Sequence, residues 1–181
     1  MNIFCYPGIT KRKELNFLLG TEYGEVPEFG FKPRIPLING LIERTEADMR
    51  IGNVIFEAKL TETDFQCQNT AIVEGYRDLH DVFDIDQLPR RGEKYASYQL
   101  LRNVLASHAR ELSFCLLLDA RRPDLIEDWY QVLRAIRTSG LRGKCMVVTW
   151  QGLAQFLPHR LQAFLDNKYG IVAEGDFLLH R

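Results

Sequence analysis

Four of the five charged residues in the segment TEADMRIGNVIFEAKL, residues 45–60, could do chemistry together. They are Glu46, Asp48, Glu57 and Lys59. Carboxylates supply the hard oxygen ligands that Mg²⁺ prefers, and one or two of them commonly hold the ion beside a phosphate. An ammonium group at the same place could hold an attacking water or stabilise negative charge on phosphoryl oxygens. The residue types therefore suit phosphodiester hydrolysis if the four side chains converge.

A Gly-Asn pair at positions 52 and 53 predicts that this segment is a β-hairpin. Glycine at the first central position satisfies the positive φ of a type II′ turn, and the turn fixes the register. One face then carries only apolar residues. On the other face, Asp48 lies opposite Glu57 and Glu46 lies opposite Lys59. The hairpin is thus expected to gather its charges on one side.

Two interpretations of this charged face remain open. Any half-buried antiparallel hairpin alternates apolar and polar residues, so the face could be an ordinary solvated surface. However, like charges directly opposite each other, such as Asp48 and Glu57, cost stability unless something neutralises them. A bound divalent cation would do so. The four cysteines and four histidines are scattered along the chain and suggest no zinc site.

The rest of the chain supplies elements that could position the hairpin. Apolar spacing and end signals predict helices and buried strands that alternate in the second half, which favours an α/β fold with a mixed sheet covered on both sides. The expected elements are a helix over 10–20 capped by Thr10 and ended by Gly20, a Pro-rich loop with at most a short strand near 36–41, a helix from about Thr70, a helix over 93–112, a strand over 113–120, a helix over 123–140, a strand over 143–150, and helical segments to 170 interrupted at Pro158.

The helix over 93–112 brings further polar residues into consideration. Tyr95, Gln99 and Arg102 are spaced by four and three residues and so share one helical face. They could complete a site on the hairpin or form a solvated helix surface, and Gln66 and Gln68 carry the same ambiguity.

The order Asp48, then Glu57-Ala58-Lys59, on a hairpin preceded by a helix, resembles the signature of the PD-(D/E)XK, or restriction-endonuclease-like, superfamily. The resemblance implies a mixed central sheet flanked by helices, with Asp48 and Glu57 as metal ligands and Lys59 as the catalytic lysine. Members often carry another glutamate on the first helix, where Glu14 is the best-placed candidate. Glu46, Gln99 and Arg102 are the other additional candidates. The proline of the family name is absent, since Ala47 precedes Asp48.

Length and composition are consistent with one domain over residues 1–181. The chain is 46% hydrophobic and has a formal net charge of −1, so any nucleic-acid contact must use local basic clusters rather than a global positive field. No apolar run reaches the length of a membrane span, and the N-terminus lacks the order of a signal peptide. A cytoplasmic protein without membrane contact is expected.

The sequence therefore predicts a metal-dependent nuclease that uses Mg²⁺ or Mn²⁺, with DNA as the expected substrate. The alternative is an inactive module of the same fold, with salt bridges such as Glu46–Lys59 on its hairpin. An α/β enzyme with another chemistry, using Asp119 or Thr149 at strand ends, lacks any supporting glycine-rich or nucleophile motif. The sequence leaves open whether a homodimer is needed to cut both strands.

Overall fold

A five-stranded mixed sheet forms the centre of the molecule, which is a computed structural model describing residues 2–173. Its strands follow the spatial order β1-β4-β5-β9-β10. The first three pair antiparallel, and β9 and β10 continue parallel to β5. The strand bounds are β1 Glu28–Phe31, β4 Ala47–Ile51, β5 Val54–Ala58, β9 Ser113–Leu118 and β10 Cys145–Thr149. The prediction of a mixed central sheet is confirmed.

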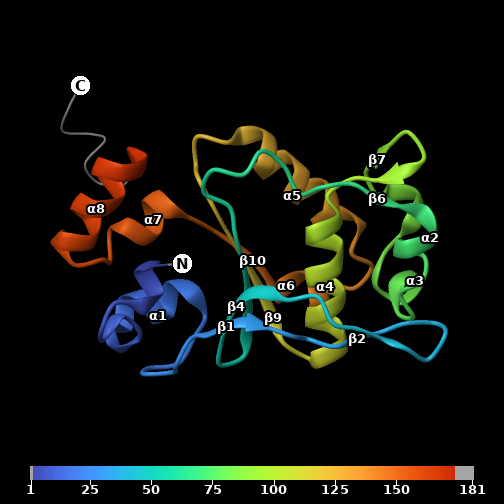
Figure 1. Cartoon of the computed structure of the whole chain (residues 1–181), viewed down its shortest axis with the longest axis horizontal. Coiled ribbons are helices and arrows are strands. Elements are labelled where there is room, and N and C mark those ends of the chain that lie inside the picture. Colours follow the sequence, from blue (N-terminus) through green and yellow to red (C-terminus); the bar gives the residue numbers. More distant parts are fainter. Residues whose placement is uncertain (1, 174–181) are drawn as a thin grey trace.

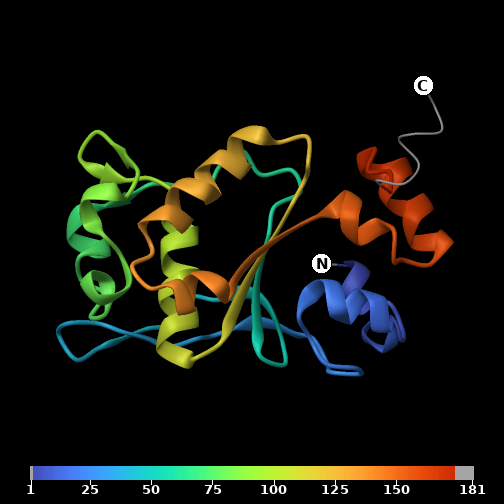
Figure 2. The ribbon, with the colours of Figure 1, turned by 180° about the vertical axis from the view of Figure 1, so that it is seen from behind.

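Helices cover both faces of this sheet (Figures 1 and 2). Helices α4 (Tyr98–Arg110) and α5 (Pro123–Ala135) pack on one face, and α1 (Lys13–Leu19), α7 (Trp150–Ala154) and α8 (His159–Tyr169) pack on the other. Strand β9 shows why two hydrophobic layers are needed. Phe114 belongs to the core under α4, whereas its neighbour Cys115 belongs to the core under α1 and α7. A strand buried on both faces is a continuous apolar run, as the sequence of β9 is.

The central hairpin of β4 and β5 has the predicted register. Met49 pairs with Phe56, and Ile51 pairs with Val54. Gly52 has a φ of 51°, the left-handed value that a type II′ turn requires at this position. However, the polar face of the hairpin is not a solvated outer surface, because β5 is the central strand and α4 lies over that face. Glu57 and Lys59 on this face are therefore buried, and Asp48 is half-buried.

Two element predictions are wrong, for local reasons. Strand β1 lies in the segment expected to be a loop, since Pro27 and Pro33 flank this edge strand rather than interrupt it. Helix α4 begins at Tyr98 rather than near residue 93, because Ser97 takes a left-handed backbone with φ 54°. Tyr95 therefore lies in the short strand β8 (Lys94–Tyr95), and it does not share a helical face with the polar residues of α4.

Smaller corrections concern helix ends. Gly20 ends α1 in a left-handed conformation as predicted, but Arg12 rather than Thr10 occupies the N-cap. The helix expected over 123–140 ends at Ala135, and the break before α8 is at Pro158 as predicted. Within residues 2–173, no helix is both long enough and apolar enough to cross a membrane. The remaining elements are η1 Asn2–Cys5, η2 Ile9–Lys11, β2 Ile35–Pro36, β3 Ile42–Glu43, β6 Gln68–Asn69, α2 Thr70–Val73, α3 Leu79–Val82, η3 Ile85–Gln87, β7 Arg90–Arg91 and α6 Ser139–Gly143.

Candidate active site

A buried ion pair lies at the end of β5. Glu57 and Lys59 are only 2% and 4% exposed, and Lys59 Nζ lies 3.1 Å from Glu57 Oε1. The two residues are two positions apart and so project to the same face of the strand. Charged groups of this kind are almost never fully buried unless they are paired. The pair thus occupies a position that a purely structural design would fill with apolar residues.

Helix α4 supplies a polar partner to each member of the pair. Asn103 Nδ2 donates to Glu57 Oε2 at 2.8 Å, and Lys59 Nζ donates to Gln99 Oε1 at 2.8 Å. Gln99 and Asn103 are one helical turn apart on the face toward β5. Asn103 is fully buried, and its Oδ1 has no hydrogen-bond partner among the described residues. Both ends of the Glu57–Lys59 pair are therefore held in place by one rigid element.

Asp48 reaches the same place from β4. The pairing of β4 with β5 ends at Met49 and Phe56, one step before Asp48 and Glu57 would face each other. Beyond that step, Asp48 Oδ2 accepts a hydrogen bond from the backbone N–H of Ala58 at 2.8 Å. The side chain of Asp48 thus replaces a ladder contact, and its charge acts directly on Glu57.

The electrostatics of Glu57 follow from this crowding. Burial raises the pKa of Glu57 above its ordinary value of 4.5, and the negative charge of Asp48 raises it further. Lys59 and the hydrogen bond from Asn103 oppose that rise without cancelling it. Ionised Glu57 is therefore costly at this position, first because it is buried and second because Asp48 repels it.

These residues open onto a cavity of about 530 Å³. Asp48, Glu57, Lys59 and Gln99 line one part of it, and the segment after β5 lines the rest. That segment is fixed by Glu62, whose carboxylate accepts from the backbone N–H groups of Leu60 and Thr61. Burial pushes the pKa of Glu62 upward, but these hydrogen bonds outweigh it and lower the pKa. The lining also includes Ala58, Thr61, Glu62, Thr63, Asp64 and Gln66.

The backbone of Lys59 is anchored on both sides. Its N–H donates to the carbonyl of Leu117 on β9 at 2.7 Å. Its carbonyl accepts from the indole Nε1 of buried Trp150 on α7 at 2.9 Å. Sheet and helix thus fix the lysine where β5 ends, so its side chain enters the cavity from a rigid support.

Three sequence candidates are placed differently from the expectation. The carboxylate of Glu46 is exposed and pairs with Lys32 at 3.3 Å rather than with Lys59, because the strands diverge before the two would meet. Glu14 is exposed on α1, which covers the opposite face of the sheet. Arg102 donates to the backbone carbonyl of Glu46 at 3.2 Å.

Asn103 is a site residue that was not predicted from the sequence. It lies in the middle of the apolar run of α4, where no local pattern distinguishes it from a buried spacer. A polar residue among buried leucines is itself a signal, because such a group needs a partner. Here that partner is Glu57.

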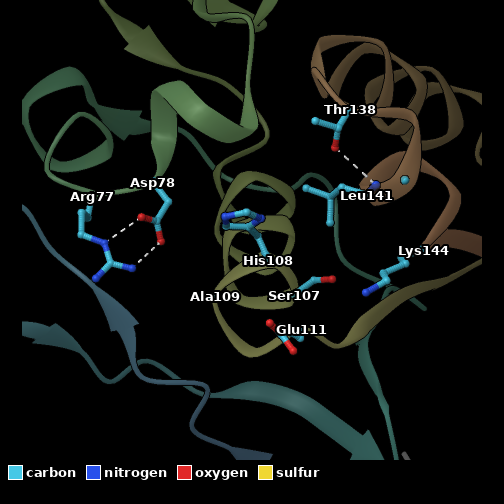
Figure 3. A pocket seen from close by; sticks show the side chains of 10 residues that line it. Arg77, Asp78, Ser107, His108, Ala109, Glu111, Thr138, Leu141 and Lys144 are labelled. Carbon is cyan, nitrogen blue, oxygen red and sulfur yellow. Dashed lines mark hydrogen bonds and ion pairs between the residues drawn. The ribbon is translucent and has the colours of Figure 1, made fainter.

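A larger cavity, of about 710 Å³, lies at the other end of α4 (Figure 3). Its charged groups include Arg77 and Asp78, which pair with each other at 2.7 Å, and the exposed residues His108, Glu111 and Lys144. In Figure 3 the Lys144 ammonium and the Arg77–Asp78 pair lie apart, on different elements around the cavity. No buried charge converges on this space among its described lining residues.

The donor set at Asp48 and Glu57 fits a hard divalent cation. Both are carboxylates, one is deeply buried, and together they carry more negative charge than Lys59 balances. Among residues 2–173, no group of three or more His, Cys, Asp or Glu side chains is placed to hold an ion. Two protein carboxylates, with water and phosphate oxygens completing the shell, is the arrangement typical of Mg²⁺.

A mixed sheet with helices on both faces, whose central strand carries a buried glutamate and lysine beside an aspartate, defines a restriction-endonuclease-like protein. The family model described as Restriction Endonuclease associating with ARP matches residues 1–170. The chain therefore belongs to the REase-ARP family, and the resemblance noted in its sequence is confirmed at that level. No curated protein and no solved structure matches the chain.

Proposed function

We propose that this chain is a metal-dependent nuclease that hydrolyses phosphodiester bonds in DNA, with residues 1–181 forming one nuclease domain. The observation that carries the proposal is the buried Glu57–Lys59 pair beside Asp48 at the wall of a cavity. Burying such a pair costs stability that an apolar replacement would not cost, and perturbed carboxylates in a cleft cluster at functional sites. Membership of a restriction-endonuclease-like family favours the same chemistry.

Asp48 and Glu57 are the residues proposed to hold Mg²⁺ or Mn²⁺. When bound, the ion supplies Lewis-acid polarisation of the phosphoryl group and lowers the pKa of a coordinated water. Because burial and the charge of Asp48 raise the pKa of Glu57, protons compete with the ion for this carboxylate more than for an ordinary glutamate. Asn103 keeps Glu57 Oε2 oriented while Oε1 remains beside Lys59.

Lys59 is proposed to act on the substrate. Its ammonium group has three N–H donors, of which one is directed to Glu57 and one to Gln99. The third remains for a non-bridging phosphoryl oxygen or the attacking water. Fixed donors aimed at developing charge contribute most when they need no reorganisation, and the backbone anchors of Lys59 provide that rigidity.

The test is cleavage of single-stranded DNA, duplex DNA and RNA with Mg²⁺ or Mn²⁺, comparing the wild type with Glu57→Ala and Lys59→Ala. We expect cleavage of DNA by the wild type and loss of it in both variants. Activity that survives Glu57→Ala unchanged would eliminate this site. A wild type that cuts none of the substrates, and binds no Mn²⁺ in calorimetry, would favour the inactive module.

The family description names an association with ARP, so a partner protein belongs to the proposal. Co-purification of ARP with the full chain would test it. No feature of residues 2–173 supports a homodimer, and the function is proposed for a single chain.

A further inference from the structure

A small cavity of about 320 Å³ lies beside the β2–β3 pair and is separate from the cavity that Asp48 and Glu57 line. Three cationic residues, Lys32, Arg34 and Arg44, line it together with Ile42. Lys32 pairs with Glu46, whereas no carboxylate lies within ion-pair distance of Arg34 or Arg44 among the described residues. The cavity thus has a net positive lining.

The register of this pair explains how the charges converge. Ile35 pairs with Glu43, and Pro36 pairs with Ile42. Arg34 directly precedes β2 and Arg44 directly follows β3, and both line the same small cavity, where like charges repel each other. Glu43 is one position out of phase with Arg44, and its Oε1 accepts from the backbone N–H of Thr45. The repulsion between the two arginines is therefore left uncompensated within the hairpin.

The backbone reinforces this arrangement. Arg34 has a φ of 58°, a left-handed conformation that non-glycine residues adopt rarely. It lies between buried Pro33 and buried Ile35, so the neighbouring residues hold the strained conformation in place. Strain of this kind at a charged, exposed residue is typical of binding sites rather than of plain surface.

The cavity is connected to the candidate active site by a short path of contacts. Strand β2 contacts α4, and Figure 1 shows the chain running from β1 through β2 past that helix. Arg102 of α4 donates to the carbonyl of Glu46, and the Glu46 carboxylate pairs with Lys32. Arg44 precedes Asp48 by four residues, which span at most about 14 Å. One nucleic-acid strand advances about 3.4 Å per nucleotide, so both sites lie within reach of one short stretch of backbone.

We propose that Lys32, Arg34 and Arg44 form a phosphate-binding subsite that grips the DNA backbone a few nucleotides from the bond that is cut. This inference rests on the proposed nuclease function for the identity of the ligand. A phosphate between Arg34 and Arg44 would neutralise their repulsion, and arginine recognises phosphate oxygens through paired hydrogen bonds. The contacts are to backbone, so the subsite positions DNA without reading its sequence.

The test measures binding rather than cleavage, and so it can be judged separately from the nuclease proposal. A fluorescein-labelled duplex is titrated with the full chain in EDTA, at salt concentrations between about 50 and 200 mM. Arg34→Gln/Arg44→Gln is compared with Arg110→Gln/Arg160→Gln. The control removes the same charge from two exposed arginines, one at the far end of α4 and one on α8, that also have no ion-pair partner among the described residues. Thermal melting checks that both variants remain folded.

We expect the Arg34/Arg44 variant to weaken binding by at least about tenfold and to reduce the salt slope by about 0.9, the contribution of the one phosphate that the two arginines share. The control should stay within about twofold of the wild type, as expected for uninvolved surface charges. Equal binding by the two variants, or no binding by the wild type, would overturn the subsite. So would an equal loss of affinity for polyglutamate, which would assign the cavity to an acidic polypeptide. If the Arg34/Arg44 variant binds DNA more weakly but the wild type cleaves no substrate in the separate nuclease test, the nuclease function is rejected and the subsite is retained.

Discussion

The two ends of α4 carry contrasting cavities. The one at its C-terminal end is larger, yet His108, Glu111 and Lys144 are exposed there and Asp78 is already paired with Arg77. The one at its N-terminal end is smaller, yet Glu57 and Lys59 are buried at its wall and are held by Gln99 and Asn103. The difference teaches that cavity volume is a poor guide to a functional site. Buried charged side chains are a better guide, because they are stable only where the fold provides partners for them.

The largest expected difference between the two ends is in catalysis. Lys59→Met removes the donor at the N-terminal end and should lower the rate of DNA cleavage by about 100- to 1000-fold, the usual cost of one fixed donor to developing charge. Lys144→Met removes an exposed lysine at the other end and should leave the rate within about twofold. Single-turnover cleavage with saturating Mn²⁺ measures both. Equal losses of cleavage rate in the two variants would contradict the assignment of catalysis to the N-terminal end of α4.

A second prediction concerns the two buried polar side chains of α4. Asn103→Ala leaves Glu57 Oε2 without its donor and should weaken Mn²⁺ binding by about 10- to 100-fold, as loss of a group that orients a metal ligand does. The matched change is Ser107→Ala, one turn further along, where the hydroxyl donates only to the carbonyl of Leu112. It should lower stability without changing Mn²⁺ affinity in calorimetry. Restored affinity in Asn103→Gln would support orientation as the cause, and unchanged affinity in Asn103→Ala would refute it.

The pH dependence of metal binding should depend on Glu57 at the N-terminal end of α4 and not on the charged residues at its C-terminal end. The pKa of Glu57 is raised above 4.5, so this carboxyl keeps its proton to a higher pH and a cation must displace it. Mn²⁺ affinity should therefore rise by about tenfold per pH unit up to that raised pKa and level off above it. Glu57→Gln should abolish this dependence, whereas Glu111→Gln beside the larger cavity should preserve it. A flat profile for the wild type contradicts the assignment.

The smallest expected effect is a gain in stability. Asp48→Asn keeps an acceptor for the N–H of Ala58 and removes the charge that opposes Glu57, so in EDTA it should stabilise the fold by about 0.5–1 kcal/mol. Because the folded-state pKa of Glu57 lies above 4.5, the contribution of Glu57 to stability is fully present below that pH and is lost as pH rises through the raised pKa. The gain should therefore increase with pH. Asp78→Asn, which breaks the pair with Arg77, should produce no gain, and denaturant melts across pH compare the two.

Short-range sequence signals predicted the central hairpin and the face on which its charged residues lie. The Gly52 turn gave the register of the hairpin, and strand parity brought Glu57 and Lys59 to one face. Parity could not show that the face would be covered, since that depends on α4, from far along the chain, packing over β5. Parity also could not show where the two strands separate. Because they separate before Glu46 reaches Lys59, Glu46 pairs with Lys32 instead.

The helical candidates show the limit of local reasoning in another way. Gln99 was found because helical spacing gave a polar face, although Tyr95 did not share it. Asn103 was missed because its role exists only once α4 lies over β5. Glu14 was placed at the site by resemblance, but a sheet with two covered faces puts α1 on the far side. Contacts between layers, unlike those within a hairpin, have no signature in local spacing.

The hydrogen bond from Trp150 to the carbonyl of Lys59 gives this protein a built-in optical reporter. The chain has two tryptophans, and the second, Trp129, is buried on α5 in the opposite core layer. With Trp129 replaced by phenylalanine, the remaining emission would come from an indole whose N–H is bonded to the backbone of the catalytic candidate. Any ligand that shifts the end of β5 would change the colour and intensity of that light, so occupancy of the cavity could be followed in real time without a label.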